Sequence, residues 1–125
     1  FVVTGFVPDV TPYFAGCRVS IAPLRYGAGV KGKINLAMSF GLPVVATTPA
    51  IEGMFLEPER DVLVADDGAA FAAAIAQLYA DETLWKQLAA GGRDNIRNHF
   101  SRDVARSTIT RLIALARSSG LTKAA

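Results

Sequence analysis

The stretch Pro23–Val45, which reads P-L-R-Y-G-A-G-V-K-G-K-I-N-L-A-M-S-F-G-L-P-V-V, constrains the fold of this chain more than any other feature. It starts where an apolar run ends, and it continues through three glycines with basic residues between them. A short amphipathic segment, Ile34–Phe40, follows, and Gly41 and Pro43 then introduce a second apolar run. This order predicts a strand, a glycine-rich loop, a helix and another strand.

The predicted loop has the chemistry of an anion site. A helix that begins in a glycine-rich loop presents unpaired backbone N–H groups and the positive end of its dipole. Glycines let the backbone approach a ligand, and Arg25, Lys31 and Lys33 add positive charge. The loop is not a Walker A motif, and its glycines match G-x-G-x-x-G in spacing alone. We therefore predict a phosphate or diphosphate site, with a flexible loop of solvated basic residues as the alternative.

Composition limits the class of protein. The 125 residues are enough for one domain, and 51% of them are hydrophobic, so the chain can bury a core. The net charge of +2 is spread along the sequence, which argues against a nucleic-acid surface. Cys17 is the only cysteine, which excludes an internal disulfide and a cysteine-based metal cluster, and we expect it to be buried.

No targeting or membrane segment is recognisable in the sequence. It has no run of about 20 apolar residues and no signal peptide, so the default setting is cytoplasmic. Phe1-Val2-Val3 already resembles a strand without an initiator methionine, and we expect the chain to be a piece of a longer protein.

The first half of the chain alternates strands with helices. Turn signals separate the elements, and a threonine followed by a proline marks a short helix with Thr11 as its N-cap and Gly16 at its end. A loop at the carboxyl end of the third strand, Thr48–Gly53, is a ligand-binding position in open α/β sheets. The predicted strands are Phe1–Val7, Arg18–Ala22, Val44–Thr47 and Asp61–Ala65.

The second half is predicted to be helical. The turn Asp66-Asp67-Gly68 precedes a helix over Ala69–Tyr79, and one of its aspartates should cap that helix. A second helix starts at Asp81; Gly91-Gly92 either breaks it or is tolerated inside it. Ser101 should cap a last helix that reaches about Arg117. The fold class is therefore α/β, a Rossmann-like parallel sheet with flanking helices over residues 1–119, which lacks its first strands, and a frayed tail over 120–125.

The motifs of this chain resemble a known enzyme family. They are V-T-G-F-V-P-D-V at 3–10, the stretch from R-V-S-I-A-P to P-V-V-A-T at 18–47, E-G at 52–53 and D-V-L-V-A-D-D at 61–67. Together they are similar to the C-terminal half of a GT-B fold glycosyltransferase of the group 1, or GT4, type. The resemblance covers nearly the whole chain.

The resemblance implies a function. In this family the C-terminal domain holds a nucleotide-diphospho-sugar donor, and an N-terminal domain, which this chain lacks, binds the acceptor. The sugar is transferred with retention of configuration, and neither a cofactor nor an obligatory metal is expected. The family's loop near the sugar and phosphates corresponds to Gly27, Ala28 and Gly29. Arg25, Lys31 and Lys33 are the candidates that offset the diphosphate charge, and the catalytic residues stay unknown.

Two positions depart from the family pattern. Many members carry two glutamates eight positions apart, the first facing the donor sugar and the second the ribose. Ala28 and Leu36 stand at the matching positions here. Ala28 belongs to a G-A-G variant of the loop, whereas Leu36 replaces a carboxylate that accepts ribose hydroxyls. Loss of such a contact costs about 1.5–3 kcal/mol of affinity.

Other candidates are weighed against structural roles. Glu52 follows a strand at the ligand edge and could meet the donor, but a solvated loop carboxylate is the plainer interpretation. His99 is the only histidine and lacks partners for a metal or a catalytic triad, and Trp85 has the spacing of a core residue. Capping explains the paired aspartates Asp66 and Asp67 better than a metal does.

Three functions compete at this point. The first is the donor-binding half of a glycosyltransferase, which is inactive without its acceptor domain; any peripheral attachment to a membrane would come through that missing domain. The second is a degenerate, non-catalytic binding or scaffold domain, which Leu36 makes credible. The third, a receiver-like phosphate module, is disfavoured because no acidic cluster ends the first predicted strand. Self-association through an exposed sheet edge is a further expectation.

Overall fold

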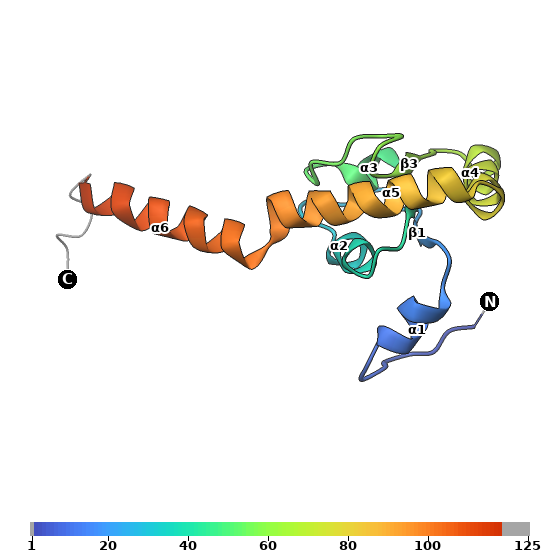
Figure 1. The fold of residues 1–125 in the computed structure, drawn as a ribbon, viewed down its shortest axis with the longest axis horizontal. Helices are drawn as coiled ribbons and strands as arrows, with labels where there is room; N and C mark the ends of the chain where they lie inside the picture. The colour runs from blue at the N-terminus through green and yellow to red at the C-terminus, as the bar shows by residue number, and fades with distance from the viewer. Residues whose placement is uncertain (1, 119–125) are drawn as a thin grey trace.

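The protein forms an α/β fold around a short parallel sheet (Figure 1). The structure is a computed structural model, and it describes residues 2–118. The sheet has the order β1-β2-β3, with β1 at Ser20–Ala22, β2 at Val44–Ala46 and β3 at Leu63–Val64. Both neighbouring pairs are parallel, and in register Ser20 lies opposite Val44 and Val45 opposite Leu63. The predicted α/β class with a parallel sheet is thus confirmed.

Helices alternate with these strands and then follow them. The two crossovers contain α2 and α3, and the chain after β3 is helical to the end of the described residues. The helical elements are α1 (Thr11–Gly16), α2 (Gly32–Ser39), α3 (Thr48–Ile51), α4 (Gly68–Ala80), α5 (Glu82–Asn95), the π-helical η1 (Ile96–Phe100) and α6 (Arg102–Ser118).

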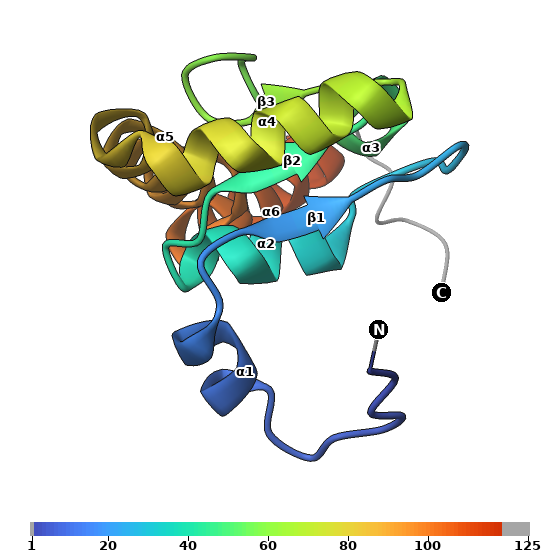
Figure 2. The same ribbon diagram turned by 90° about the vertical axis from the view of Figure 1, so that its right-hand side faces the viewer.

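The sheet is covered on both faces, as the continuous apolar strands predict. Val44 and Ala46 of β2 point into a core formed with Ile34, Ala37 and Met38 of α2. Between them, Val45 points the other way, into a second core with α4 and α5. Figure 2 shows α4 and α2 on opposite faces of the strands. All three residues of β2 are fully buried, so this central strand carries no side chain to solvent.

Helix α5 tolerates its glycine pair because other elements approach it closely there. A Cβ on Gly92 would lie 2.9 Å from Cγ of Met38 in α2, and one on Gly91 would overlap the carbonyl oxygen of Arg60. Glycine costs about 1 kcal/mol relative to alanine inside a helix, and the close packing offsets that cost. The helix therefore runs through both glycines to Asn95 and continues as η1 to Phe100.

The predicted strand at the start of the chain is wrong over its described part. Residues 2–7 belong to no strand, and Val2, Val3 and Phe6 are 88–92% exposed. A doubly wound sheet has the strand order 3-2-1-4-5-6, in which strands 3 and 4 are not neighbours. Since β1, β2 and β3 follow the order of strands 4, 5 and 6, residues 2–7 match strand 3 and find no pairing partner among the described residues.

Three local predictions also need correction. The predicted loop over Thr48–Gly53 begins with α3, because a proline in its first turn favours a helix start. Val10, not Thr11, is the N-cap of α1, and the Asp9 carboxylate accepts a hydrogen bond from the Thr11 N–H at 2.9 Å. Cys17 is exposed, since it follows α1 at the periphery and joins neither core.

The C-terminal helix leaves the body of the protein (Figure 1). Ser101 caps it as predicted, because its hydroxyl accepts a hydrogen bond from the Val104 N–H at 3.3 Å. None of the residues of α6 is buried. Among the described residues, no helix combines the length and apolar character that a membrane crossing requires.

Candidate functional site

Three helices begin at the same edge of the sheet. Each of α2, α3 and α4 follows the carboxyl end of a parallel strand, so their N-termini lie along one rim. An α-helix leaves its first N–H groups without intrahelical partners, and the aligned peptide dipoles make this end positive. A helix whose first N–H groups already have acceptors is not available to an anionic ligand, whereas a helix with free N–H groups is.

Two of the three N-termini are already occupied by aspartates. The Asp67 carboxylate accepts hydrogen bonds from the N–H groups of Ala69 (3.0 Å) and Ala70 (2.9 Å) in α4. Asp66 reaches from the end of β3 to α3, where its carboxylate accepts from the N–H and the hydroxyl of Thr48, both at 2.7 Å. The Thr48 N–H, followed by its hydroxyl, lowers the pKa of Asp66 below the usual range. These carboxylates take the places that an anion would need.

The N-terminus of α2 is open. Its N-cap is Lys31, whose side chain makes no capping hydrogen bond. The Lys31 carbonyl accepts the helix's first bonds, from Ile34 N–H (2.9 Å) and Asn35 N–H (3.3 Å). Within the described part of the chain, the N–H groups of Gly32 and Lys33 have no hydrogen-bond acceptor. This is the free helix end that the glycine-rich loop predicts.

A buried cation lies beside this open helix end. Lys31 is only 8% exposed, and its ammonium nitrogen Nζ donates to the carbonyl of Glu52 at 3.0 Å. Its backbone N–H donates to the sulfur of Met54 at 3.1 Å. No carboxylate among the described residues forms an ion pair with Lys31. A buried ammonium without a counter-charge is costly, and an anion at the helix end would reduce that cost.

The segment 52–55, which contacts Lys31, is itself held in place by α5 and η1. Asn95, at the end of α5, is buried and donates from Nδ2 to the carbonyls of Phe55 (2.7 Å) and Met54 (3.3 Å). Phe55 has a positive φ of 56° and stacks on the ring of His99 at 4.6 Å. Thus α5 and η1 fix the 52–55 segment, which in turn fixes Lys31 at the start of α2.

The glycine-rich loop lies outside the sheet. Figure 2 shows the chain after β1 projecting beyond the strand before it returns to α2. Gly29 has a φ of 75°, which favours glycine, whereas Ala28 has an ordinary negative φ and both residues are exposed. Gly27 touches the site, because a Cβ there would lie 4.0 Å from Cε of Lys31. The loop is therefore free to receive a ligand over the open end of α2.

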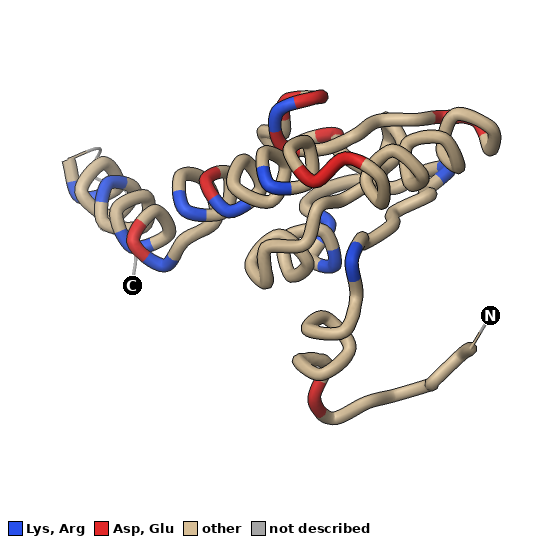
Figure 3. Tube along the Cα trace, turned by 45° about the vertical axis from the view of Figure 1, so that its right-hand side comes forward, with Lys and Arg blue, Asp and Glu red and all other residues tan. Residues whose placement is uncertain are grey.

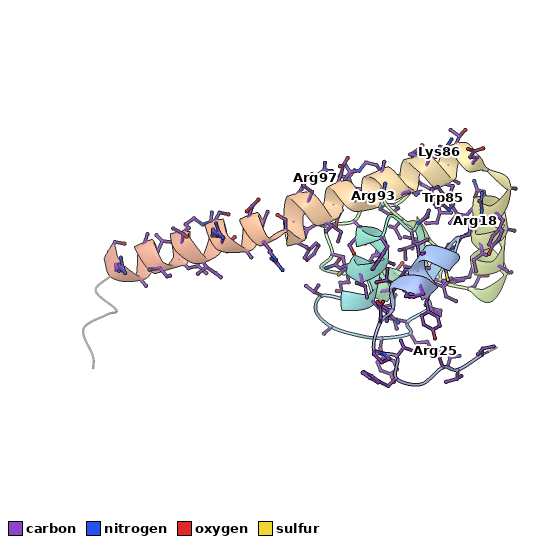
Figure 4. All side chains as sticks on the ribbon, turned by 60° about the horizontal axis from the view of Figure 1, so that its bottom comes forward. Arg18, Arg25, Trp85, Lys86, Arg93 and Arg97 are labelled. Atoms are coloured by element: carbon purple, nitrogen blue, oxygen red, sulfur yellow. The ribbon has the colours of Figure 1, made fainter. Side chains whose placement is uncertain are left out.

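A pocket of about 810 Å³ lies at the carboxyl ends of all three strands. Of the predicted site residues it includes only Arg25, which Figure 4 places on the loop, away from Arg18 and Trp85. The pocket walls are mostly apolar and come from the segment after each strand and from the first turns of α4. They are formed by Pro23, Leu24, Arg25, Thr47, Thr48, Pro49, Asp66, Asp67, Gly68, Phe71, Ala72 and Ile75.

The structure brings some of the predicted residues together and separates others. Gly27, Lys31 and the backbone of Glu52 meet at the start of α2. The Glu52 side chain and Lys33 are exposed, and Leu36 is 39% exposed on α2. Leu36 lies one turn after Gly32 and therefore shares that residue's face of α2. No cluster of three potential metal ligands occurs among residues 2–118.

Met54 and Asn95 contribute to this rim but were not predicted as site residues, and Thr48 was predicted only as part of a loop. Thr48 opens the predicted loop Thr48–Gly53, and the rule that ligands bind at the carboxyl ends of strands had already placed that loop at the rim. Met54 and Asn95 carry no sequence signal, because each acts on a residue more than twenty positions away. Trp85, expected in the core, is half-buried, and its indole N–H donates to the Arg18 carbonyl at 2.8 Å.

Comparison with known proteins supports the family resemblance. Residues 1–81 match the family model described as glycosyl transferases group 1. The fold is similar to the crystal structure of the C-terminal domain of a glycosyl transferase group 1 family protein (LpcC) from Francisella tularensis, with a TM-score of 0.68 and 16% identity. The match covers 78% of this chain and 52% of that one, so this chain spans about half of the solved domain. No curated protein matches the sequence.

Proposed function

The chain belongs to the glycosyl transferases group 1 family, and we propose that it is the donor-binding part of a sugar-transferring enzyme. The observation that carries the proposal is the open N-terminus of α2 beside the buried Lys31. Its neighbours α3 and α4 have aspartates at their N-termini, so α2 is the helix on this rim that suits an anion. The ligand class is a nucleotide-diphospho-sugar.

Each group at the rim has a defined role in this proposal. The N–H groups of Gly32 and Lys33 donate to a phosphate, and the Lys31 ammonium lowers the electrostatic cost of its charge. Gly27, Ala28 and Gly29 bring the loop backbone close to the sugar and phosphates. Lys33 and Arg25 neutralise further charge from the open side, and Glu52 presents its carboxylate at the same rim.

The reaction in this proposal is sugar transfer with retention of configuration and without an obligatory metal. Positive backbone and side-chain groups stabilise the diphosphate as it leaves with its extra negative charge. The acceptor and the remaining catalytic groups belong to a domain outside this chain. We therefore expect the 125-residue chain to bind donor without turning it over, and sugar transfer by this chain alone would contradict that expectation.

The first test is a thermal-shift titration of the chain with UDP, GDP, ADP, CDP and inorganic phosphate. A ligand that binds the folded state stabilises it by RT ln(1 + [L]/Kd), about 2.7 kcal/mol at 100 times Kd. One nucleoside diphosphate should shift the transition more than the others and more than phosphate. Equal, negligible shifts with all five ligands would contradict the proposed site.

A second candidate function is a domain that has lost its donor site, and Leu36 is the observation that favours it. This apolar side chain is exposed on α2, at the position where the resemblance implies a ribose-binding carboxylate. The variant Leu36→Glu separates the two candidates. A weakened but intact site should gain about tenfold in nucleotide affinity, roughly 1.4 kcal/mol. An unchanged affinity would favour the scaffold function.

A further inference from the structure

A second pocket lies at the edge of the sheet opposite the open N-terminus of α2. Its volume is about 360 Å³, and its walls come from the residues just before β1, the residues just before β2, and α5. Arg18 lies two residues before β1, and Leu42 lies two residues before β2. The pocket is therefore at the amino ends of the strands, whereas Lys31 and the candidate donor site are at the carboxyl ends.

Two arginines in this pocket have no acidic partner. Arg18 and Arg93 both line it, and none of the described residues that line it is acidic. No hydrogen bond or ion pair among the described residues involves either guanidinium group. Between Val10 and Leu24, Arg18 is the only charged residue, and Figure 3 shows no acidic position in the link from α1 to β1. The pocket walls thus carry two positive charges and no negative one.

The Glu82 carboxylate interacts with Lys86 rather than with Arg18. Nζ of Lys86 lies 2.6 Å from an oxygen of Glu82, one turn earlier on α5. The hydrogen bond from Lys86, followed by the charge of Lys86, lowers the pKa of Glu82, and the charge of Arg18 makes the smallest contribution. The guanidinium N–H groups of Arg18 therefore stay free for another acceptor.

Aromatic side chains hold Arg18 in position. Its guanidinium carbon lies 5.8 Å from the ring centre of Tyr79 and 5.9 Å from that of Trp85. The indole N–H of Trp85 also donates to the Arg18 carbonyl at 2.8 Å, and Figure 4 shows the two residues next to each other. A guanidinium group that stacks on aromatic rings keeps its in-plane N–H groups available for a bidentate anion. This preorganisation of Arg18 lowers the entropic cost of binding a ligand.

Arg93 reaches the pocket from α5 and packs against Gly41. A Cβ at Gly41 would overlap the Arg93 guanidinium group, so the glycine makes room for it. The carbonyls at the end of α2 already accept backbone hydrogen bonds, as that of Met38 does from the Gly41 N–H at 2.9 Å. No described hydrogen bond joins Arg93 to these carbonyls. Its N–H groups are therefore free as well.

The chemistry of the pocket fits a small organic phosphate. Guanidinium groups match the oxygens of a phosphate, and a phosphate monoester carries close to two negative charges at neutral pH. The stacked rings of Phe14 and Phe40, 5.0 Å apart, add an apolar wall. We propose that this pocket binds a phosphate monoester, with the phosphate between Arg18 and Arg93 and the organic group against the two phenylalanines. The volume suits a small ligand, since small-molecule sites measure about 300–1,000 Å³.

Two residues that occur once in the chain report on this pocket. Trp85 is the only tryptophan and Cys17 the only cysteine, and both line it. Phenyl phosphate should change the fluorescence of Trp85 and slow the alkylation of Cys17 by iodoacetamide in the 125-residue chain. Benzyl alcohol, which has the ring without the charge, should do neither. No effect of phenyl phosphate, or an equal effect of benzyl alcohol, would overturn the proposal.

Four variants locate the bound phosphate. Arg18→Gln and Arg93→Gln should each weaken phenyl phosphate binding about tenfold or more, because each removes charge-assisted hydrogen bonds. Arg97→Gln is the matched control, since Arg97 lies one turn after Arg93 and pairs with Asp94. It should keep wild-type affinity, and so should Lys31→Met at the other end of α2. Loss of binding in Lys31→Met with retention in Arg18→Gln would place the anion at the open helix end and overturn the proposal.

The variants should fold like the wild type, because Arg18 and Arg93 are exposed and belong to neither core. Circular dichroism checks the fold, and protection of Cys17 reports binding in Arg18→Gln, where the Trp85 signal itself changes. If Arg93→Gln unfolds through its contact with Gly41, Arg18→Gln decides alone. Unchanged affinity in folded Arg18→Gln would contradict the proposal. An equal loss in Arg97→Gln would do the same, because it would show unspecific charge attraction.

Discussion

The two ends of α2 differ in how their backbone groups are satisfied. At the C-terminal end, Gly41 adopts a φ of 74°, and its N–H donates to the Met38 carbonyl at 2.9 Å. The Leu42 N–H donates to Ala37 at 3.0 Å, and the Arg93 guanidinium packs against Gly41. At the N-terminal end the first N–H groups are unpaired and the N-cap offers no side-chain oxygen.

The C-terminal end of α2 therefore serves the stability of the fold, whereas the N-terminal end is available to bind a ligand. The C-terminal end is closed by α5, and its hydrogen bonds and packing stabilise the native state. The N-terminal end forgoes a cap worth about 1 kcal/mol and keeps the positive end of the dipole accessible beside Lys31. We infer that substitutions at the closed end change stability, whereas substitutions at the open end change ligand affinity.

The largest expected effect is at the closed end. The variant Gly41→Val should lower the free energy of unfolding by about 2–3 kcal/mol, because a β-branched residue is strained at positive φ. The added side chain would also displace the Arg93 guanidinium. Urea denaturation measures the loss. Gly32→Ala is the matched control: a Cβ there meets nothing within 4 Å, so stability should not fall. Equal destabilisation by both variants would contradict the inference that the closed end of α2 sets stability and the open end does not.

The next effect is on affinity at the open end. The variant Lys31→Met keeps the length of the buried side chain but removes its charge and its bond to the Glu52 carbonyl. Affinity for the preferred nucleoside diphosphate should fall about 10- to 100-fold, since hydrogen bonds to charged groups contribute roughly 1.5–3 kcal/mol.

Calorimetric titration measures this loss, and exposed Lys33→Met is its control with a smaller expected effect. If Lys31→Met bound nucleotide as tightly as the wild type, Lys31 would be a structural residue only.

A smaller effect is expected at the N-terminus of α4, which Asp67 caps. The variant Asp67→Ala removes the acceptor of two α4 N–H groups and should cost about 1 kcal/mol of stability. Nucleotide affinity should stay unchanged, because Asp67 serves α4 rather than the ligand. Thermal denaturation and the titration above test both statements. Tighter nucleotide binding in Asp67→Ala would mean that α4, too, accepts the anion.

The smallest effect depends on pH. The pKa of Asp66 is lowered in the folded state by its bonds to Thr48, so the ionised carboxylate stabilises the fold. That contribution is complete above the ordinary carboxylate pKa of about 4 and is lost as the pH falls through the lowered value. Urea midpoints of the wild type and Asp66→Asn should differ near neutral pH and converge in acid. A constant difference would contradict this assignment.

Local signals predicted most elements correctly. The glycine-rich loop, the helix after it and the apolar strands of the sheet follow from patterns within a few residues, and so do the caps at Asp67 and Ser101. The loop predicted over Thr48–Gly53 failed although Pro49 follows a threonine, which is the signal that marked α1. The strand predicted over the first residues failed because pairing depends on neighbouring strands that a local pattern does not contain.

The candidate site also has one feature that the sequence predicts and one that it does not. The open end of α2 was predictable, because a lysine at the N-cap has no oxygen to accept the helix N–H groups. The burial of Lys31 was not, since Glu52 and Met54 are more than twenty residues away and are positioned by Asn95 from another helix.

The sequence by itself determined the alternation of strands and helices, the glycine-rich loop and the family, because each depends on residue order over short distances. Only the tertiary structure decided which cation is buried and which helix N-termini are occupied. Asp66 reaches Thr48 from the end of another strand, and Asn95 reaches the segment beside Lys31 from the end of α5. Contacts between distant segments set these properties, and their partners are chosen by packing rather than by proximity in the chain.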